Sequence, residues 1–191
     1  MFLLKQPSTD EVLQFISQQR HSTFSYPEVG ASAANRLPEG YNIDRNSILL
    51  GTGEFIWRRA VLAIREWQMF NMPWIRLYWP TSSIEVGTNV AVLINHFGFC
   101  SLNPARIVYV VDTEEPVVKY GFAYGTLEEH SERGEERFTV EWNRSEDRVW
   151  YNILAFSRPN KALAKMGYPL ARMLQKKFAE ASKLAMLRST D

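Results

Sequence analysis

The stretch from Tyr120 to Trp142 holds the residues of this chain best suited to acid–base chemistry. His130 lies there among several glutamates, and two of these, Glu135 and Glu136, open the run "EERFTVEW". Alternation along that run places Phe138 and its apolar neighbours on one face of a strand. Counting back by two puts Glu136 in the same apolar phase and Glu135 in the polar phase. A carboxyl group that faces an apolar interior has a raised pKa, which suits a general acid or base.

The strand before this loop predicts a partner for Glu136. Tyr124 lies on the apolar face of the run "YGFAYGTL". If the hairpin closes around residues 127–133, Tyr124 lies beside Glu136. His130, on the loop, could then act as a proton shuttle near neutral pH. We therefore predict Glu136, His130 and Tyr124 as a catalytic set.

Structural roles are open for the same side chains. Glu136 could brace the hairpin through hydrogen bonds with Tyr124, Arg133 or Arg137. His130 could be exposed on a hydrophilic loop. The residue types alone do not decide between these roles and acid–base chemistry.

Neither a metal nor a cofactor is predicted. His130 with Glu128 or Glu132 offers one imidazole and loosely spaced carboxylates, which falls short of a closed ligand set. Cys100 is the only cysteine and cannot form an internal disulfide. With His96 as its nearest histidine, it does not complete a zinc site.

Aromatic residues of the hairpin could line an apolar cavity. In the register above, Phe122 faces Phe138. The predicted ligand-binding residues on these strands are Tyr120, Phe122, Phe138 and Trp142. Asn103 and Arg106, at the entrance of the preceding strand, complete the predicted set. Arg106 alternates with an apolar neighbour, so it either anchors an acidic group of a ligand or points outward.

Composition limits the class of protein. With 191 residues, of which 46% are hydrophobic and 13% aromatic, the chain can fill one core. A net charge of +1 gives no global field for nucleic acid, so no nucleic-acid partner is predicted. No segment has the pattern of a signal peptide or a membrane span. Because one cysteine favours a reducing compartment, we predict a cytoplasmic protein and leave its oligomeric state open.

Periodicity predicts a single domain over residues 1–191, with an N-terminal extension (1–40) and a core (41–191). The extension begins with a helix capped by Ser8 and Glu11 and continues as a loop. One or two short strands precede a helix that runs from residue 52 or 53 to about residue 70. Strand candidates with a period of two follow at 75–80, 84–97, 105–112, 117–127, 136–142 and 148–157. Their short polar connections indicate an antiparallel meander.

The chain ends in a long predicted helix that begins near Pro169, after a short turn at Asn160 that Gly167 interrupts. Its apolar stripe is Leu170, Met173, Leu174, Phe178, Ala181, Leu184 and Ala185. The opposite face is basic, and it could either contact anionic lipid or be the exposed side of a core helix.

This order of elements predicts an α+β fold in which a curved, mostly antiparallel sheet packs on the C-terminal helix. A curved sheet must cover one face, and an amphipathic helix along its concave side does so. The order resembles the helix-grip fold of START-like lipid-binding proteins and polyketide cyclases. That resemblance implies a gap between sheet and helix that can hold an apolar ligand.

Several motifs occur in an order that resembles an uncharacterised family of bacteria and plants with only a domain-of-unknown-function label. They are "YPEVGAS", "GYNIDRN" with "LGTGE", "SLNPARIVYVVD", "GFAYGTLEEHSERGEERF", and "AFSRP" with "GYPLARMLQKKFAEAS". The resemblance covers nearly the whole chain from Tyr26 onward. It implies a single domain with a recurrent His-and-Glu hairpin, matched here by His130, Glu135 and Glu136, and it implies no activity.

Three classes of function follow from these patterns. The leading prediction is a protein that binds a small apolar or amphipathic molecule between sheet and helix. The first alternative is a small acid–base enzyme, a cyclase, isomerase or hydrolase, that uses the Tyr/His/Glu set. The second is a protein-interaction module, which would expose a contiguous apolar patch instead of a pocket.

Overall fold

The computed structural model describes residues 1–34, 36–79, 83–96, 98–115, 117–160 and 168–191. Within these ranges one sheet dominates the fold, and all of its paired strands are antiparallel. The predicted turn and the interruption at Gly167 lie outside the described residues. The strands are β1 (Phe2–Leu3), β2 (Asn42–Thr52), β3 (Ile75–Tyr78), β4 (Asn89–Asn95), β5 (Cys100–Thr113), β6 (Val118–Thr126), β7 (Glu132–Asn143) and β8 (Arg148–Pro159).

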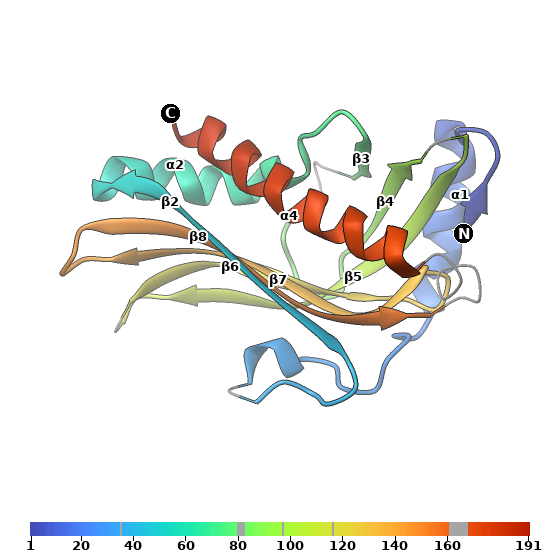
Figure 1. The fold of residues 1–191 in the computed structure, drawn as a ribbon, viewed down its shortest axis with the longest axis horizontal. Helices are drawn as coiled ribbons and strands as arrows, with labels where there is room; N and C mark the ends of the chain where they lie inside the picture. The colour runs from blue at the N-terminus through green and yellow to red at the C-terminus, as the bar shows by residue number, and fades with distance from the viewer. Residues whose placement is uncertain (35, 80–82, 97, 116, 161–167) are drawn as a thin grey trace.

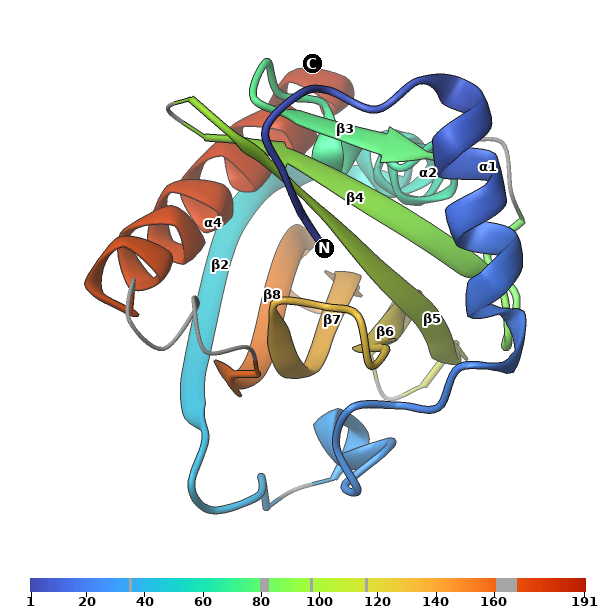
Figure 2. The same cartoon turned by 90° about the vertical axis from the view of Figure 1, so that its right-hand side faces the viewer.

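The strand order is β2-β8-β7-β6-β5-β4-β3, with β1 paired to the start of β5. Figure 2 shows the sheet curving from β3 and β4 round to β8 and β2, with α4 (Tyr168–Thr190) across its open side. Close strand approach accompanies this curvature. A Cβ atom on Gly121 would lie 2.0 Å from the Phe138 carbonyl oxygen, so glycine is required there. The predicted curved antiparallel sheet on a C-terminal helix is confirmed.

Helix α1 (Thr9–Gln18) belongs to the N-terminal extension and packs outside the sheet (Figure 2). The predicted capping box is present, because Ser8 and Glu11 exchange side-chain and backbone hydrogen bonds. Val12 and Ile16 are buried in a small cluster with Leu93 of β4. The following loop crosses the convex face of the sheet, as Figure 1 shows, and includes the short 3-10 turns Gln19–His21 and Ala31–Ala33.

Helix α2 (Gly53–Arg65) is shorter than predicted. Trp67 adopts a left-handed backbone conformation, with φ 57°, and a 3-10 turn (Gln68–Phe70) follows it. That conformation is uncommon for a bulky residue and ends the helix. Trp67 is 2% exposed and packs on Phe122, with ring centroids 4.7 Å apart. Tertiary packing therefore overrides the apolar periodicity that continued to Phe70.

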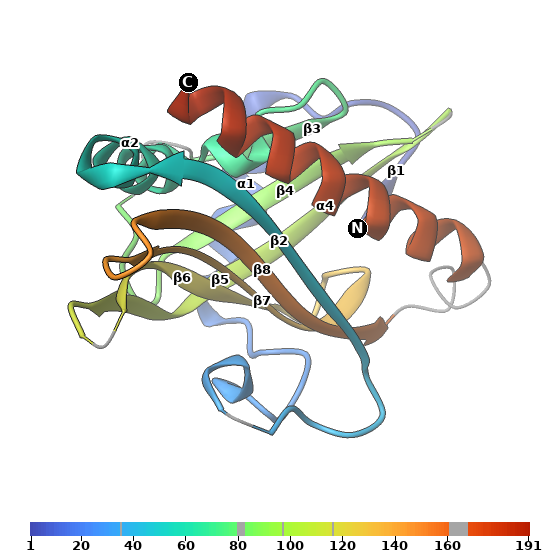
Figure 3. The ribbon, with the colours of Figure 1, turned by 60° about the vertical axis from the view of Figure 1, so that its left-hand side comes forward.

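The packed face of α4 also differs from the predicted stripe. Leu170, Met173 and Leu184 are 44%, 54% and 51% exposed. Ala185 of the predicted stripe is buried, and Phe178 and Ala181 pack against the core, but the buried positions also include Ala179, Ser182 and Met186, which lie outside the stripe. Ser182 tolerates burial because its Oγ lies 2.8 Å from the Tyr151 hydroxyl and shares a hydrogen bond with it. Figure 3 shows α4 and β2 diverging toward the N-terminal end of the helix.

Candidate functional site

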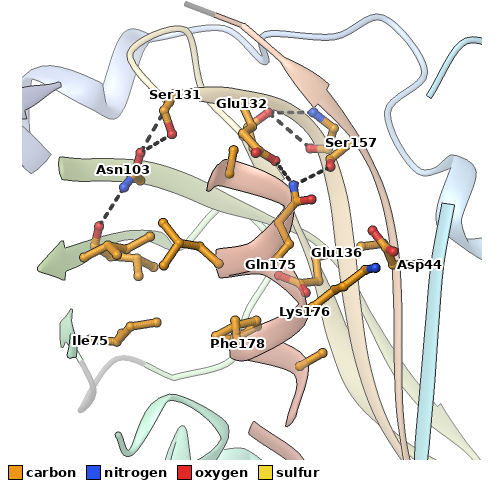
Figure 4. Close-up of a pocket in the computed structure, with 18 of the residues that line it drawn as sticks. Asp44, Ile75, Asn103, Ser131, Glu132, Glu136, Ser157, Gln175, Lys176 and Phe178 are labelled. Carbon is orange, nitrogen blue, oxygen red and sulfur yellow. Dashed lines mark hydrogen bonds between the residues drawn. The ribbon is translucent and has the colours of Figure 1, made fainter. Parts of the chain in front are cut away.

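A cavity of about 790 Å³ lies between α4 and the concave face of the sheet (Figure 4). This volume lies in the range of small-molecule sites, about 300–1,000 Å³. Apolar side chains from the turn after α2, the sheet and α4 form most of its wall, among them Phe70, Trp74, Ile75, Val92, Ile153 and Phe178. Ile43 and Leu170 also line it and are exposed, so the cavity reaches the surface between β2 and α4.

Polar contacts hold the N-terminal half of α4 over this cavity. The Arg172 guanidinium donates to both carboxylate oxygens of Asp44 on β2, at 2.5 and 2.8 Å. Gln175 Nε2 donates to Glu132 on β7 and to Ser157 Oγ on β8. We call these five residues the α4 latch. The latch ties one helix to three strands, and Figure 4 shows its Gln175 end.

Glu136 and Tyr124 face the cavity as a hydrogen-bonded pair. They are direct partners in the β6–β7 register, as predicted, and the Tyr124 hydroxyl donates to Glu136 Oε2 at 2.8 Å. Both line the cavity. Glu136 is half-buried, and its accessible part faces the cavity. The carboxyl group is therefore largely removed from bulk water.

This environment shifts the ionisation of both groups. The pKa of Glu136 is raised to about 7, chiefly by burial; the Tyr124 hydrogen bond lowers it, and the charges of Glu132 and Asp44 contribute to the rise. Burial and the adjacent carboxylate raise the pKa of Tyr124 well above its ordinary value. A carboxyl group that titrates near pH 7 can accept or donate a proton under physiological conditions.

His130 lines the same cavity, but within the described residues no hydrogen bond or ion pair joins it to the Glu136 carboxyl group. Its Nδ1 accepts a hydrogen bond from the Glu132 backbone N–H at 3.0 Å. Burial and the charged N-terminus lower the pKa of His130 to about 3. In this geometry His130 is a neutral hydrogen-bonding group at pH 7. Its pKa does not lie near neutrality, as the predicted role of proton shuttle requires.

The predicted ligand-binding residues divide between two regions. Asn103 lines the cavity, and its Oδ1 accepts hydrogen bonds from the backbone N–H and the hydroxyl of Ser131. Arg106 lies away from the cavity. Its guanidinium donates to Asn89 Oδ1 and to the Gln19 carbonyl oxygen, so it fixes the N-terminal extension.

The predicted aromatic residues lie in the other half of the concave face. Phe122 and Phe138 are fully buried in the core. The Tyr120 hydroxyl accepts from Arg65 Nε at 3.3 Å, and Trp142 stacks on Trp57 of α2 with centroids 6.4 Å apart. Helix α2 and the turn after it fill this half, and none of the four residues lines the cavity.

Sequence reasoning missed most of the cavity wall. Phe70 lies at the predicted end of a helix, and neither Trp74 nor Gln175 is among the predicted binding residues. Leu170, Leu174 and Phe178 carried a signal, because all three lie on the predicted apolar stripe and line the cavity. His96 lines the cavity too, where its Nε2 lies 2.9 Å from Ser101 Oγ and burial lowers its pKa.

Glu135 occupies the opposite face of β7 and is 2% exposed. It accepts hydrogen bonds from the Tyr26 hydroxyl, the Gly30 N–H, and both the N–H and the hydroxyl of Ser32. Loop residues that precede β2 thus saturate this carboxylate. Although Glu135 also borders the cavity, these hydrogen bonds commit its carboxylate to holding the loop on the sheet.

Two features are absent from the described ranges. Within them, no His, Cys, Asp or Glu residues are grouped in a way that could hold a metal ion. No helix in the same part of the chain is both long and apolar enough to cross a membrane.

Comparison with known sequences places residues 25–185 in a family described as "Domain of unknown function (DUF1990)". A UPF0548 protein of Dictyostelium discoideum is 35% identical over 206 residues, covering 99% of this chain and 95% of that protein. A UPF0548 protein of Deinococcus radiodurans is 34% identical over 189 residues, covering 94% and 93%.

Solved structures share the fold at low sequence identity. A hypothetical protein from Helicobacter pylori has a TM-score of 0.51 at 16% identity, covering 83% of this chain and 96% of that one. A norcoclaurine synthase point mutant from Thalictrum flavum, solved with a transition-state analogue, has a TM-score of 0.50 at 12% identity, covering 82% and 100%. These likenesses establish a START-like helix-grip fold.

Proposed function

This chain belongs to the DUF1990 family, and we propose that it binds a small amphipathic molecule between its sheet and α4. The cavity of about 790 Å³ carries the proposal. Protein interiors pack as densely as organic crystals, so an apolar space this large forfeits many contacts unless a molecule fills it. Polar groups in its wall, Glu136 and Asn103 among them, would orient such a molecule.

The rim of the cavity supports entry from solvent. Ile43 and Leu170 are both exposed and both line the cavity, so an apolar chain can pass between β2 and α4 there. The α4 latch beside this rim consists of hydrogen bonds and an ion pair between half-buried groups. Such contacts contribute only about 1 kcal/mol each, so the helix end can open at modest cost.

Filling the cavity tests the proposal. Ala155 on β8 lines it, and Ala155→Phe should abolish binding of the neutral probe N-phenyl-1-naphthylamine, measured by fluorescence. Ala34→Phe, at an exposed position outside the cavity, is the matched control and should bind like wild type. Native mass spectrometry of protein purified from its own host should show a retained small molecule. No probe binding to a folded wild-type protein would contradict the proposal.

A second candidate is acid–base catalysis by Glu136 and Tyr124. The specific observation is a carboxyl group with a pKa of about 7 that faces a cavity of ligand size beside a tyrosine hydroxyl. His130 would serve as a neutral hydrogen-bond donor. If a bound molecule is converted, Glu136→Gln should abolish turnover and preserve binding; turnover unchanged by this substitution would remove the candidate.

A further inference from the structure

We propose that the cavity selects an amphipathic amine, with a cationic nitrogen beside the Glu136 carboxylate and an apolar body against the aromatic wall. This inference rests on the proposed function and specifies its ligand class. Three features of the described residues support it: an incompletely bonded carboxylate, the charges around it, and the shape of the adjoining wall.

The Glu136 carboxylate has unused hydrogen-bonding capacity. A carboxylate offers two oxygens with about four acceptor sites. Among the described residues, Tyr124 supplies the one hydrogen bond that Glu136 accepts. The other oxygen, Oε1, accepts no hydrogen bond from the described residues, and it is not one of their fully buried atoms. Because Glu136 lines the cavity, its free acceptor sites are accessible from there. An ammonium group, with its N–H donors, matches this unfilled demand.

The surrounding charges favour a cation over an anion. Asp44 and Glu132 both act on Glu136 to make its ionisation harder, so the potential there is negative. Arg172 is committed to Asp44 by two hydrogen bonds. Arg45 and Lys176 line the cavity but are exposed, and in the described part of the chain neither forms an ion pair with Glu136. A ligand carboxylate would be repelled here.

The remaining neighbours of Glu136 do not supply positive charge. Tyr151, like Tyr124, has a pKa raised well above its ordinary value by burial and is a neutral phenol. His130 is also neutral at pH 7 because burial and the charged N-terminus lower its pKa to about 3. An ionised Glu136 would therefore be an uncompensated charge in a largely apolar cavity unless the ligand provides a cation.

The apolar wall begins next to this carboxylate. Tyr124, the hydrogen-bond partner of Glu136, stacks on Phe70 with ring centroids 6.2 Å apart, and Figure 4 shows Glu136 of β7 and Phe178 of α4 on the same side of the Gln175 contacts. Phe178 lies 5.5 Å from Phe70, centroid to centroid, and Ile75 and Trp74 extend the surface. Aromatic faces near a cation add cation–π attraction to the burial of an alkyl or aryl body. The cavity thus offers an amine both a counter-ion and an apolar surface.

Ligands of equal length and different head group test this inference. Decylamine, decanol and decanoate should be titrated into the protein at pH 8 by isothermal calorimetry. We expect decylamine to bind at least tenfold more tightly than decanol, and decanoate to bind most weakly. Glu136→Gln should bring the ratio of the affinities for decylamine and decanol (the amine-to-alcohol ratio) near unity without weakening the binding of decanol. Glu146→Gln, the same change on an exposed turn, should leave the ratio unaltered.

A measurement on the wild-type protein avoids dependence on a variant that folds poorly. Because Glu136 titrates near pH 7 and the amine stays charged, the amine-to-alcohol ratio should fall between pH 8 and pH 5.5. Equal affinity for amine and alcohol at pH 8, or tighter binding of decanoate, would overturn the amine inference and leave the proposed function standing. Binding of none of the three compounds would overturn both.

Discussion

Glu135 and Glu136 are consecutive residues of β7 with opposite environments. Glu135, on the convex face, accepts from Tyr26, Gly30 and Ser32 and has its hydrogen-bonding capacity filled. Glu136, on the concave face, accepts only from Tyr124 in the described part of the chain and meets a cavity. The difference shows that the number of hydrogen bonds a carboxylate accepts, more than its burial, decides its role. A carboxylate with all acceptor sites filled maintains structure, and one with free acceptor sites is available for chemistry.

Neutralising the two carboxylates should separate these roles most strongly. Glu135→Gln replaces a charged acceptor with an amide whose N–H₂ group opposes the donors around it. We expect a loss of about 3 kcal/mol in the free energy of unfolding, measured with urea at pH 5.5. Glu136→Gln at the same pH should cost less than about 1 kcal/mol, because Glu136 is protonated there. Equal losses from both variants would break the comparison.

The pH dependence of stability should reveal Glu136 next. Its pKa in the folded protein is raised above the ordinary value of 4.5 to about 7. Its stabilising contribution is therefore complete below about pH 4.5 and is lost as the pH rises through about 7. Relative to Glu136→Gln, wild type should lose about 2 kcal/mol between pH 5 and pH 8.

Other groups also titrate in this pH range, so the stability of wild type must be compared with that of Glu136→Gln at each pH. His130 has a lowered pKa, so its contribution is present above about pH 6.5 and is lost as the pH falls. It opposes the Glu136 effect on the acid side, and the difference between wild type and Glu136→Gln removes it. If the difference in the free energy of unfolding between wild type and Glu136→Gln does not change from pH 5 to pH 8, the pKa of Glu136 is not raised.

Removing one tyrosine hydroxyl from each site gives the smallest and most closely matched test. Tyr26→Phe deprives Glu135 of a buried donor and should cost about 1.5 kcal/mol in urea unfolding. Tyr124→Phe should cost less than about 1 kcal/mol at pH 5.5, where Glu136 is protonated. Because the Tyr124 hydrogen bond lowers the pKa of Glu136, its loss should also move the pH-dependent fall in stability to higher pH. A larger cost for Tyr124→Phe than for Tyr26→Phe would reverse the assignment.

Local patterns predicted the strand faces well. The alternation in "ERFTVEW" put Glu136 in the apolar phase, and the hairpin register paired Tyr124 with Glu136 and Phe122 with Phe138. A period of two is a property of neighbouring residues, and a short loop restricts how two strands can align. The capping box of α1 followed for the same reason, because its donors and acceptors lie within four consecutive residues.

Patterns that depend on distant partners were predicted less well. The exposed Leu170, Met173 and Leu184 show that apolar spacing identified only part of the packed face of α4, which also includes Ser182, buried against Tyr151. Glu135 read as an outward polar residue, although a loop about a hundred positions earlier in the chain covers it. No local spacing records either contact.

By itself, the sequence determined the element order, the curved antiparallel sheet with its terminal helix, and the face on which Glu136 lies, because these follow from short-range periodicity and turn length. Only the tertiary structure decided which half of the concave face stays open. Helix α2 and Trp67 fill the half that contains Phe122 and Trp142. Over the other half, hydrogen bonds hold the N-terminal part of α4 to the strands, and a cavity remains beside Glu136. The volume between two layers depends on side chains brought together from distant parts of the chain, and no single segment specifies it.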